Sequence, residues 1–555
     1  MDSLFSARTR RADLDAAAAA PVDLLVIGAG ITGAGIARDA ALRGIRTALV
    51  DAGDFGGGTS SRSTCLVHGG LRYLEHGWLS LVFEASRERR VLLRIAPHLV
   101  RPMAFLFPVH AGGRVGRWRL AAGLWLYDLL SAFRNVHAHR TLSRRAVQKA
   151  EPRLRSQGLL GGAVYYDAYC DDARLVLANA RAAHRSGALV ASYATVRSFE
   201  KAGGQIRGAV LSDTVEGRLL TVHARVVVNA TGPWTDAVRQ LDEPGTPPLL
   251  RPTKGVHLAV PRHRIGNAGA LTLTSPVDGR VMFILPSDDI TIVGTTDTDY
   301  DGDPATVAPT ADDVTYLLRS ANAVFPDARL APHDVIAAWA GLRPLLKDGA
   351  EGTTAAVPRE HRISESATGL LTITGGKLTT YRAMAAELVD VVAAKLHRID
   401  GRRVPDRAPT AAEPLPGGEV ADLELLVREL VKEQVPDQVA RHLVDTYGSE
   451  AMAIANLATR DSALAEPLAA GVPILRAEVV HQARREMALS VSDVMIRRTH
   501  LFLRHPGQGT EASPVVARLL AHELGWDAAR EAASLSGYLA EVQRMRQALT
   551  PPPVS

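Results

Sequence analysis

The fold of this chain is decided near its beginning, by the stretch Val26-Ile27-Gly28-Ala29-Gly30-Ile31-Thr32-Gly33-Ala34-Gly35. An apolar run leads into the glycines, and a segment with helical character, 31–42, follows them. This order is the fingerprint of a dinucleotide-binding βαβ unit. Gly28 allows the tight turn, Gly30 lets a pyrophosphate approach the backbone, and Gly33 lets the helix pack closely against the strand. The stretch therefore predicts a bound dinucleotide.

A second apolar segment, 47–50, completes this unit and ends in Asp51. A carboxylate at this place can accept hydrogen bonds from the ribose hydroxyls of an AMP group. The start of the intervening helix offers unpaired N–H groups and the positive end of its dipole to the phosphates. The fingerprint alone leaves open which dinucleotide is bound, a nicotinamide or a flavin.

Length and composition limit the function classes. A chain of 555 residues, 46% hydrophobic and 22% charged, is typical of a globular protein with about two to four domains. Its two cysteines, Cys65 and Cys170, exclude a disulfide framework and a cluster held by four thiolates. The longest apolar run is too short for a spanning helix. The 64 basic residues against 59 acidic ones carry no nucleic-acid signature, so we expect no nucleic-acid partner and no metal site.

Three further segments favour FAD, because a flavin dinucleotide must be held along its whole extended length. The apolar run 225–230 predicts a strand that ends in a small-residue turn at Gly232. The loop Thr59-Ser60-Ser61 offers hydroxyl and N–H groups to the pyrophosphate or the ribityl chain. The segment 372–380 combines a strand, the pair Gly375-Gly376 and a helix start, whose N–H groups can stabilise the negative charge of a reduced flavin.

Apolar periodicity predicts other elements of the first 400 residues. Spacing typical of a helix occurs at 79–95 and 380–396, and strand-like runs occur at 255–260, 281–285, 290–293 and 370–374. Strands that return to one α/β layer from such distant parts of the chain imply an interrupted cofactor domain with a substrate domain threaded through it.

Five motifs give the chain a resemblance to the FAD-dependent (aerobic, respiratory) glycerol-3-phosphate dehydrogenases. They are the runs 59–75 (TSSRSTCLVHGGLRYLE), 254–257 (KGVH), 293–299 (VGTTDTD), 339–345 (WAGLRPL) and 374–382 (TGGKLTTYR). The resemblance extends over about residues 21–400, and the helical C-terminal region also fits the family. Cys65 is a departure, because members of this family commonly carry lysine there.

The resemblance implies an α/β fold in which a Rossmann-like FAD-binding domain is interleaved with an antiparallel-sheet substrate domain, as in D-amino-acid oxidase, plus a C-terminal helical domain. We expect the FAD-binding parts at about 21–75, 160–245 and 335–404, and the substrate-binding parts at about 76–159 and 246–334. The proline- and alanine-rich segment 405–418 is typical of a linker, and 419–548 is almost entirely helical in pattern.

The activity implied by the resemblance is oxidation of sn-glycerol 3-phosphate to dihydroxyacetone phosphate, by hydride transfer from C2 to flavin N5. The electrons would pass to a membrane quinone. Three alternatives stay open at this point: a glycerol-3-phosphate oxidase that uses oxygen, a flavin enzyme of the amine or amino-acid oxidase type, and a flavin protein that binds or modifies RNA.

The same resemblance implies roles for individual residues. The catalytic residues would be His68, Arg343 and Lys377. The residues that bind the substrate would be Arg72, Tyr73, His257 and Arg359. Arginine suits a phosphate dianion because its planar fork matches the phosphate oxygens. The predicted contacts to FAD are Gly28, Gly30, Gly33, Asp51, Thr59, Ser60, Ser61, Gly232, Gly375, Gly376, Leu378 and Thr379.

Each predicted catalytic residue has a purely structural alternative. His68 could be a core histidine satisfied by a carbonyl group, Arg343 an ion-pair partner at a domain seam, and Lys377 a surface residue at a helix start. The proton of the C2 hydroxyl can leave to His68, since the ordinary pKa of histidine lies near neutral pH. It can also leave to water while Arg343 and Lys377 stabilise the alkoxide. The sequence does not separate these routes.

The segment 114–134 has the character of a helix at a membrane surface. It joins an arginine-rich start to leucines, two tryptophans and a tyrosine, and it ends in Arg134. An amphipathic core helix with solvated arginines is the alternative. With the resemblance, the segment predicts a cytoplasmic enzyme peripherally associated with the inner face of the cytoplasmic membrane, and a homodimer is compatible with the same features.

Overall fold

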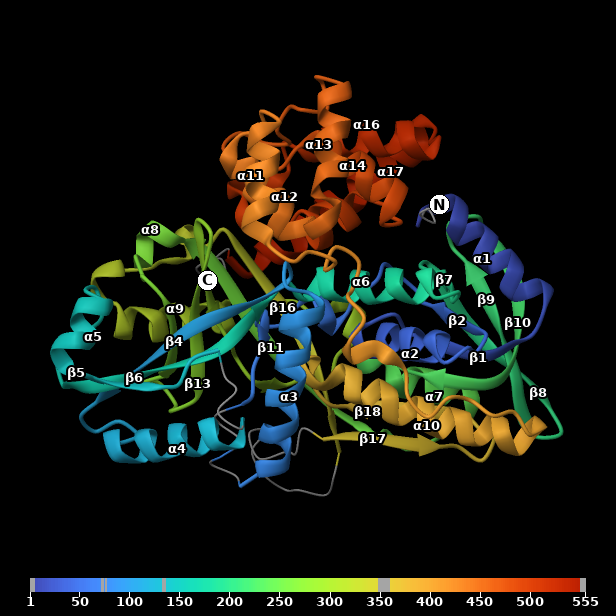
Figure 1. The fold of residues 1–555 in the computed structure, drawn as a ribbon, viewed down its shortest axis with the longest axis horizontal. Coiled ribbons are helices and arrows are strands. Elements are labelled where there is room, and N and C mark those ends of the chain that lie inside the picture. Colours follow the sequence, from blue (N-terminus) through green and yellow to red (C-terminus); the bar gives the residue numbers. More distant parts are fainter. Residues whose placement is uncertain (1–4, 71–73, 75–76, 132–135, 348–359, 550–555) are drawn as a thin grey trace, which may run out of the picture.

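The computed structural model describes residues 5–70, 74, 77–131, 136–347 and 360–549. These residues form two β-sheets that lie beside each other and a helical domain, which lies above both sheets in the view of Figure 1. The sheet at the right of Figure 1 carries the glycine fingerprint, and the larger sheet is at the left. The predicted α/β class with a separate C-terminal helical domain is confirmed.

The first sheet is parallel at its centre, as a dinucleotide-binding sheet must be. Its strands follow the order β17-β18-β10-β1-β2-β7, and β8 and β9 extend β10 as an antiparallel ribbon. β1 lies parallel to both β2 and β10. The strands are β1 Val22–Ile27, β2 Thr47–Val50, β7 Leu189–Ala191, β8 Ala194–Ala202, β9 Gln205–Asp213, β10 Arg218–Asn229, β17 His361–Glu365 and β18 Leu371–Gly375.

Helices cover both faces of this sheet, and this explains why β1 is apolar throughout. Leu24 and Val26 face a core formed with α2 (Ile31–Leu42), α6 (Asp172–Arg185) and α10 (Tyr381–Asp400). Leu25 and Ile27 face the opposite layer, which contains α1 (Ala7–Ala19). The short helix α7 (Thr235–Asp242) follows β10.

The second sheet is antiparallel except for the parallel pair β12–β4. Its order is β15-β11-β14-β13-β12-β4-β6-β3, with β16 added to β11 and β5 added to β6. Its strands are β3 Leu66–Val67, β4 Val100–His110, β5 Arg140–Ser143, β6 Leu159–Cys170, β11 Leu250–Pro261, β12 Ala270–Thr274, β13 Val281–Ser287, β14 Ile290–Gly294, β15 Thr298–Asp299 and β16 Ala337–Leu346.

Helices also enclose this second sheet. One face packs against α9 (Ala311–Val324), and the other packs against α3 (Leu79–Ile95), α4 (Arg117–Leu130) and the C-terminal helices. Two short helices, α5 (Arg144–Ala150) and α8 (Arg262–Ile265), lie at the outer end of this sheet in Figure 1.

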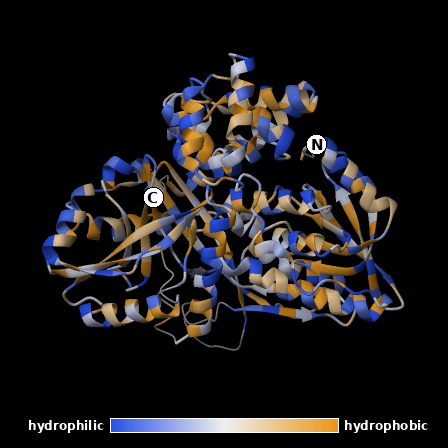
Figure 2. Cartoon of the chain, viewed as in Figure 1, coloured by the Kyte–Doolittle hydropathy of each residue, from blue (hydrophilic) through white to orange (hydrophobic). Residues whose placement is uncertain are grey.

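The C-terminal helical domain completes the molecule. Its helices are α11 Leu423–Lys432, α12 Asp437–Tyr447, α13 Ala451–Arg460, α14 Arg476–Arg485, α15 Leu501–Arg504, α16 Ser513–Leu524 and α17 Ala528–Arg546, with a π-helical turn at Asp493–Arg498. Figure 2 shows hydrophobic residues along these helices and along the strands beneath them. None of the helices within the described ranges has the length and apolar character that crossing a bilayer requires.

The predicted helices over 31–42 and 79–95 occur as α2 and α3 with those bounds. Three segments expected in the FAD-binding parts, 66–67, 160–170 and 337–346, form β3, β6 and β16 of the second sheet. All three are largely apolar, and an apolar run fits a buried strand of either sheet, so the sequence pattern does not assign it to one of them.

The predicted linker 405–418 is exposed over part of its length, but it is anchored to the rest of the molecule at two places. Leu415 is fully buried, and its backbone N–H donates to the carbonyl of Ile95 in α3 at 2.8 Å. Thr410 is also buried and accepts a hydrogen bond from Arg382 Nη1 at 3.2 Å. The segment therefore fixes the C-terminal domain against the cofactor domain.

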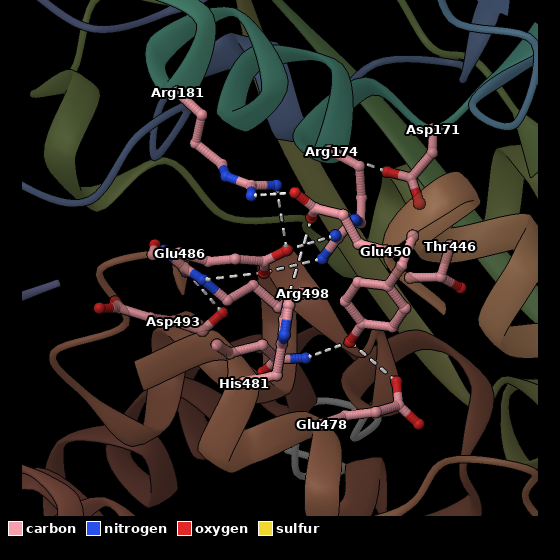
Figure 3. A network of polar contacts seen from close by, with 12 residues as sticks. Asp171, Arg174, Arg181, Thr446, Glu450, Glu478, His481, Glu486, Asp493 and Arg498 are labelled. Atoms are coloured by element: carbon pink, nitrogen blue, oxygen red, sulfur yellow. Dashed lines mark hydrogen bonds and ion pairs between the residues drawn. The ribbon is translucent and has the colours of Figure 1, made fainter. Parts of the chain in front are cut away.

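Buried ion pairs join these two domains (Figure 3). Arg174 of α6 donates to both carboxylate oxygens of Glu486, at 3.0 and 2.5 Å. Arg181, two turns further along α6, donates to Glu450 at 2.7 Å. Glu486 is fully buried, and a buried charge is tolerated only when it is paired and hydrogen-bonded. These pairs therefore hold the two domains in one relative position.

We expect Arg174→Met to destabilise the protein by about 3–5 kcal/mol, because it leaves the buried carboxylate of Glu486 without its bidentate partner. The shift of the first unfolding midpoint in urea measures this loss. Arg441→Met is the matched control, since Arg441 forms exposed ion pairs with Asp437 and Glu424, and its midpoint should stay at the wild-type value. Equal midpoints for both variants would contradict a structural role for the buried pair.

Candidate active site

The glycine turn between β1 and α2 is packed too closely for larger residues. Gly28 has a φ of +100°, and a Cβ there would lie 2.7 Å from the carbonyl oxygen of Ala230. A Cβ at Gly33 would overlap the carbonyl oxygen of Gly28. Because no side chain separates the end of β1 from the start of α2, the two pack backbone against backbone. The N–H groups at the start of α2 can then meet a phosphate.

Asp51 is held at the end of β2 with its carboxylate oriented. Oδ2 accepts a hydrogen bond from Ala29 N at 2.6 Å, and Oδ1 accepts one from Gly53 N at 2.9 Å. Each oxygen keeps a further lone pair for a ligand hydroxyl. Burial raises the pKa of Asp51 to about 6, although both backbone bonds oppose that shift. The carboxyl group is therefore mainly ionised at neutral pH.

The loop 59–68 connects the fingerprint to the second sheet. Ser60 Oγ accepts a hydrogen bond from Ile31 N at the start of α2, at 3.1 Å. Thr59 donates its hydroxyl to the carbonyl of Leu342 in β16 at 2.6 Å. Two residues predicted to contact the cofactor thus lie between the glycine turn and the strand that carries Arg343.

Thr64, in the middle of this loop, meets His257 of β11. Its hydroxyl lies 3.0 Å from His257 Nε2, and the imidazole stacks on Trp339 with a centroid distance of 5.3 Å. His257 is 2% exposed, and burial together with the charge of Arg343 lowers its pKa to about 3. Within the described residues no hydrogen bond reaches its Nδ1. His257 is thus a neutral group, unsuited to accept a proton in catalysis.

Arg343 extends from β16 toward β14 and β15. It donates to Thr295 Oγ1 and to Asp297 Oδ1, each at 3.2 Å, and to the carbonyl of Thr296 at 3.3 Å. These distances are at the long end for charged hydrogen bonds, and the guanidinium group remains half-buried. Arg343 thus forms an ion pair with Asp297, as its structural alternative supposed, but Asp297 lies between β14 and β15 of the same sheet and not across a domain seam.

His68 lies at the far end of the loop, just after β3. Its backbone N–H donates to Thr379 Oγ1 at 3.2 Å, and the Thr379 hydroxyl donates to the His68 carbonyl at 3.4 Å. Thr379 belongs to the short 3-10 turn Leu378–Thr380 between β18 and α10. Lys377 precedes that turn. Burial raises the pKa of Glu84 on α3, and the charges of His361 and Lys377 oppose this rise.

A buried network behind His68 was not predicted from the sequence. Gly69 N donates to Tyr127 OH and to Asp167 Oδ1, each at 3.0 Å. Tyr127 OH donates to Asp167 at 2.6 Å, and Arg89 donates to both side chains. The four residues come from four separate segments, so no local motif could indicate the contact. The network fixes the backbone that follows His68.

The other predicted site residues divide into two groups. Gly30, Ser61, Gly232, Gly375, Gly376 and Leu378 lie in the turns described above or in the turn after β10. Arg72, Tyr73 and Arg359, predicted to bind substrate, lie outside the described residues, so their positions stay predictions. Among the residues that the structure describes, no cluster of His, Cys, Asp and Glu is arranged to hold a metal ion.

The sequence matches two families in succession. Residues 23–390 match the family described as FAD dependent oxidoreductase, and residues 408–531 match the C-terminal domain of alpha-glycerophosphate oxidase. A curated relative is glycerol-3-phosphate dehydrogenase 2 of Mycobacterium tuberculosis, which is 38% identical over 526 residues, 94% of this chain and 88% of the relative.

Two solved structures share the architecture. The glycerol-3-phosphate dehydrogenase from Bacillus halodurans, complexed with FAD, is 33% identical and has a TM-score of 0.82 over 99% of this chain and 100% of that one. The L-alpha-glycerophosphate oxidase from Mycoplasma pneumoniae, with FAD bound, has a TM-score of 0.56 over 72% of this chain and 99% of that one. At 16% identity, this second likeness shows the fold alone.

The close-packed glycine turn, the oriented carboxylate and the helix start fit the AMP and pyrophosphate half of FAD. We expect Asp51→Asn to weaken FAD binding about tenfold to hundredfold, because hydrogen bonds to a charged group contribute roughly 1.5–3 kcal/mol. Titration of the deflavinated protein with FAD, followed by flavin fluorescence, measures the dissociation constant.

The same titration has a pH dependence. Asp51 loses its charge as the pH falls through about 6, so wild-type affinity should decline below that pH. The Asp51→Asn variant carries no titrating group at this position and should show a flatter profile. Identical profiles for the two proteins would contradict a role for the Asp51 carboxylate.

Proposed function

Because the chain belongs to the family of FAD-dependent glycerol-3-phosphate dehydrogenases, we propose that it oxidises sn-glycerol 3-phosphate to dihydroxyacetone phosphate and passes the electrons to a membrane quinone. FAD, when bound, supplies the hydride acceptor. Its AMP half would be held at Asp51 and its flavin end beside the turn 375–380. The observation that carries the proposal is a set of contacts made by the loop 59–68, which ends in His68. This loop contacts Leu342, the neighbour of Arg343 in β16, as well as His257 of β11 and Thr379 of the turn 378–380.

Arg343 is the described residue that we propose to bind the substrate. A phosphate dianion needs planar, charged donors in a partly dry site. Arg343 is half-buried, and its charge acts on the neighbouring His257, so its guanidinium group is placed to meet a phosphate or the substrate hydroxyl. The neutral His257, whose buried Nδ1 lacks a partner in the described part of the chain, would offer a hydrogen bond to the substrate. Arg72, Tyr73 and Arg359 remain the further phosphate candidates.

His68 is the residue that we propose to take the proton from the C2 hydroxyl. Its backbone is fixed on one side by Thr379 and on the other by the Gly69 network, so the imidazole projects from a rigid segment. His257 is excluded from this role because its pKa of about 3 leaves it without basicity at neutral pH. Lys377, at the start of the 3-10 turn, would stabilise the oxygen that loses the proton.

Anaerobic addition of sn-glycerol 3-phosphate should bleach the visible absorbance of the flavin. His68→Gln should slow this bleaching about 10²–10⁴-fold while FAD stays bound, because general-base catalysis contributes that factor. His223→Gln is the control, since His223 is exposed on β10, and it should bleach at the wild-type rate. Absence of bleaching in the wild-type protein contradicts the substrate, and wild-type bleaching in His68→Gln transfers the proton-accepting role to water.

The electron acceptor is a separate question. A dehydrogenase reduces a quinone analogue under air and releases little peroxide, whereas an oxidase of this fold releases one peroxide for each substrate consumed. Measurement of both products with one substrate, in one enzyme preparation, separates the two. Stoichiometric peroxide would overturn the quinone proposal and leave the substrate proposal intact.

Helix α4 supports a membrane location for this enzyme. Leu120, Leu124 and Tyr127 on its inner face are buried, while on its outer face Trp118 is 90% exposed and Trp125 62% exposed. The alternative, a core helix with solvated arginines, accounts for the exposed Arg117 and Arg119 but not for the two exposed tryptophans. An apolar outer face with an arginine-rich start is typical of helices that lie in a membrane interface. In Figure 1, α4 lies at the lower edge of the molecule, opposite the C-terminal domain.

We expect Trp118→Ser/Trp125→Ser to weaken binding to vesicles of anionic phospholipid about tenfold or more, because each buried aromatic contributes roughly 1.5–3 kcal/mol. Cosedimentation with vesicles measures the partition coefficient. Leu219→Ser is the control, because Leu219 is exposed on β10. Charge reversal of Arg117 and Arg119 to Glu should act in the same direction, while Arg134 lies outside the described residues. Unchanged cosedimentation would place the enzyme off the membrane.

A further inference from the structure

Asp54 is a buried carboxylate in the turn that follows β2, close in sequence to Asp51, and is 3% exposed. Two arginines from the C-terminal domain hold it. Arg497 donates from Nε to Oδ2 at 2.6 Å. Arg498 donates from Nη1 to Oδ2 at 2.7 Å and from Nη2 to Oδ1 at 3.1 Å. Arg498 therefore binds both oxygens of a carboxylate that belongs to the cofactor domain.

These two arginines are themselves fixed. They end the π-helical turn Asp493–Arg498, in which Arg497 Nη2 donates to Asp493 Oδ1 at 2.7 Å. Arg498 Nη2 also donates to the main-chain carbonyl of Glu486 at 2.8 Å. Figure 3 shows Arg498 between Glu486 and Asp493. The carboxylates of Asp54 and Asp493 thus balance the charges of the two arginines, as burial of all four groups requires.

The turn that carries Asp54 also shapes the fingerprint. Gly53 N donates to Asp51 Oδ1 at 2.9 Å, and Gly56 N donates to the carbonyl of Ala29 at 3.0 Å. Ala29 N in turn donates to Asp51 Oδ2. A displacement of Asp54 therefore moves both the carboxyl group of Asp51 and the backbone of the glycine turn.

Tyr193 provides a second link along the same path. Its backbone N–H donates to the carbonyl of Gly53 at 3.0 Å, and its hydroxyl donates to Asp493 Oδ1 at 2.6 Å. Other contacts between the domains are of a different kind. Arg181 of α6 pairs with Glu450, and it makes no hydrogen bond to the turn 51–58 among the described residues. The contacts at Asp54 are thus directed at the cofactor turn.

We propose that Arg497 and Arg498 are positioning residues for FAD, which clamp Asp54 so that Asp51 presents its carboxylate to the adenosine ribose. The C-terminal helical domain thereby sets the affinity of the cofactor domain for FAD. This inference rests on the placement of the AMP half at Asp51 given under the proposed function. It is independent of the substrate and of the electron acceptor.

Electrostatics acts in the same direction as the geometry. The charge on Asp54 raises the pKa of Asp51, whereas Arg497 lowers it. Loss of Arg497 therefore favours the protonated form of Asp51, which is the poorer acceptor for ribose hydroxyls.

The test is an FAD titration of the deflavinated full-length chain, together with thermal unfolding. Arg498→Met should raise the dissociation constant about tenfold to hundredfold, as loss of a group that orients a binding residue does elsewhere. Arg181→Met is the matched control, because it also removes a buried arginine from the domain interface. It should lower the melting temperature without changing the dissociation constant. If Arg498→Met does not fold, the nearly isosteric Asp54→Asn replaces it, with the same expected loss.

Each outcome decides the matter. Wild-type FAD affinity in Arg498→Met or Asp54→Asn overturns the positioning role. Equal weakening by Arg498→Met and Arg181→Met also overturns it, because general loosening of the interface then explains the loss. Wild-type affinity in Asp51→Asn overturns the placement of FAD, and the inference with it. Weakening in Asp51→Asn and Arg498→Met, but not in Arg181→Met, supports both.

Discussion

The contact between β1 and α2 is the constraint on which the rest of the molecule depends. A Cβ at Gly33 would overlap the Gly28 carbonyl, so strand and helix meet backbone to backbone. This contact fixes the start of α2 behind the sheet and directs its free N–H groups and its dipole to one point. Ser60 of the loop 59–68 accepts the N–H of Ile31 at that point. The two glycines therefore set one of the anchors of the loop 59–68.

Burial of charge is the second constraint. It explains why the C-terminal helices cannot be removed without destabilising the cofactor domain. Two buried ion pairs, Arg174–Glu486 and Arg498–Asp54, cross between the domains. In each pair, the arginine and the carboxylate come from different domains. Removal of the helical domain would expose or orphan these groups, which costs several kcal/mol per ion. The helical domain is part of the cofactor site in this energetic sense.

How much of the fold and of the site can be predicted from the sequence depends on how far apart in the chain the interacting residues are. The bounds of α2 and α3 were predictable because helical periodicity is local. The sheet that β16 joins was not, since an apolar strand pairs equally well in either sheet. Asp54 and Arg498 are 444 residues apart, and neither belongs to a local motif. Of the predicted site, the loop 59–68 is brought together with His257, with Thr379 and with Leu342, which precedes Arg343. The roles of the predicted side chains stay predictions.

The same reasoning links the outer surface to the site. Trp125 and Tyr127 lie on opposite faces of α4, one exposed and the other fully buried. Tyr127 OH accepts the N–H of Gly69, which follows His68 directly. The exposed tryptophan and the tyrosine that holds the backbone beside the predicted base therefore belong to one helix. If α4 lies on a bilayer, as proposed, the helix that meets the membrane also holds the segment that carries His68.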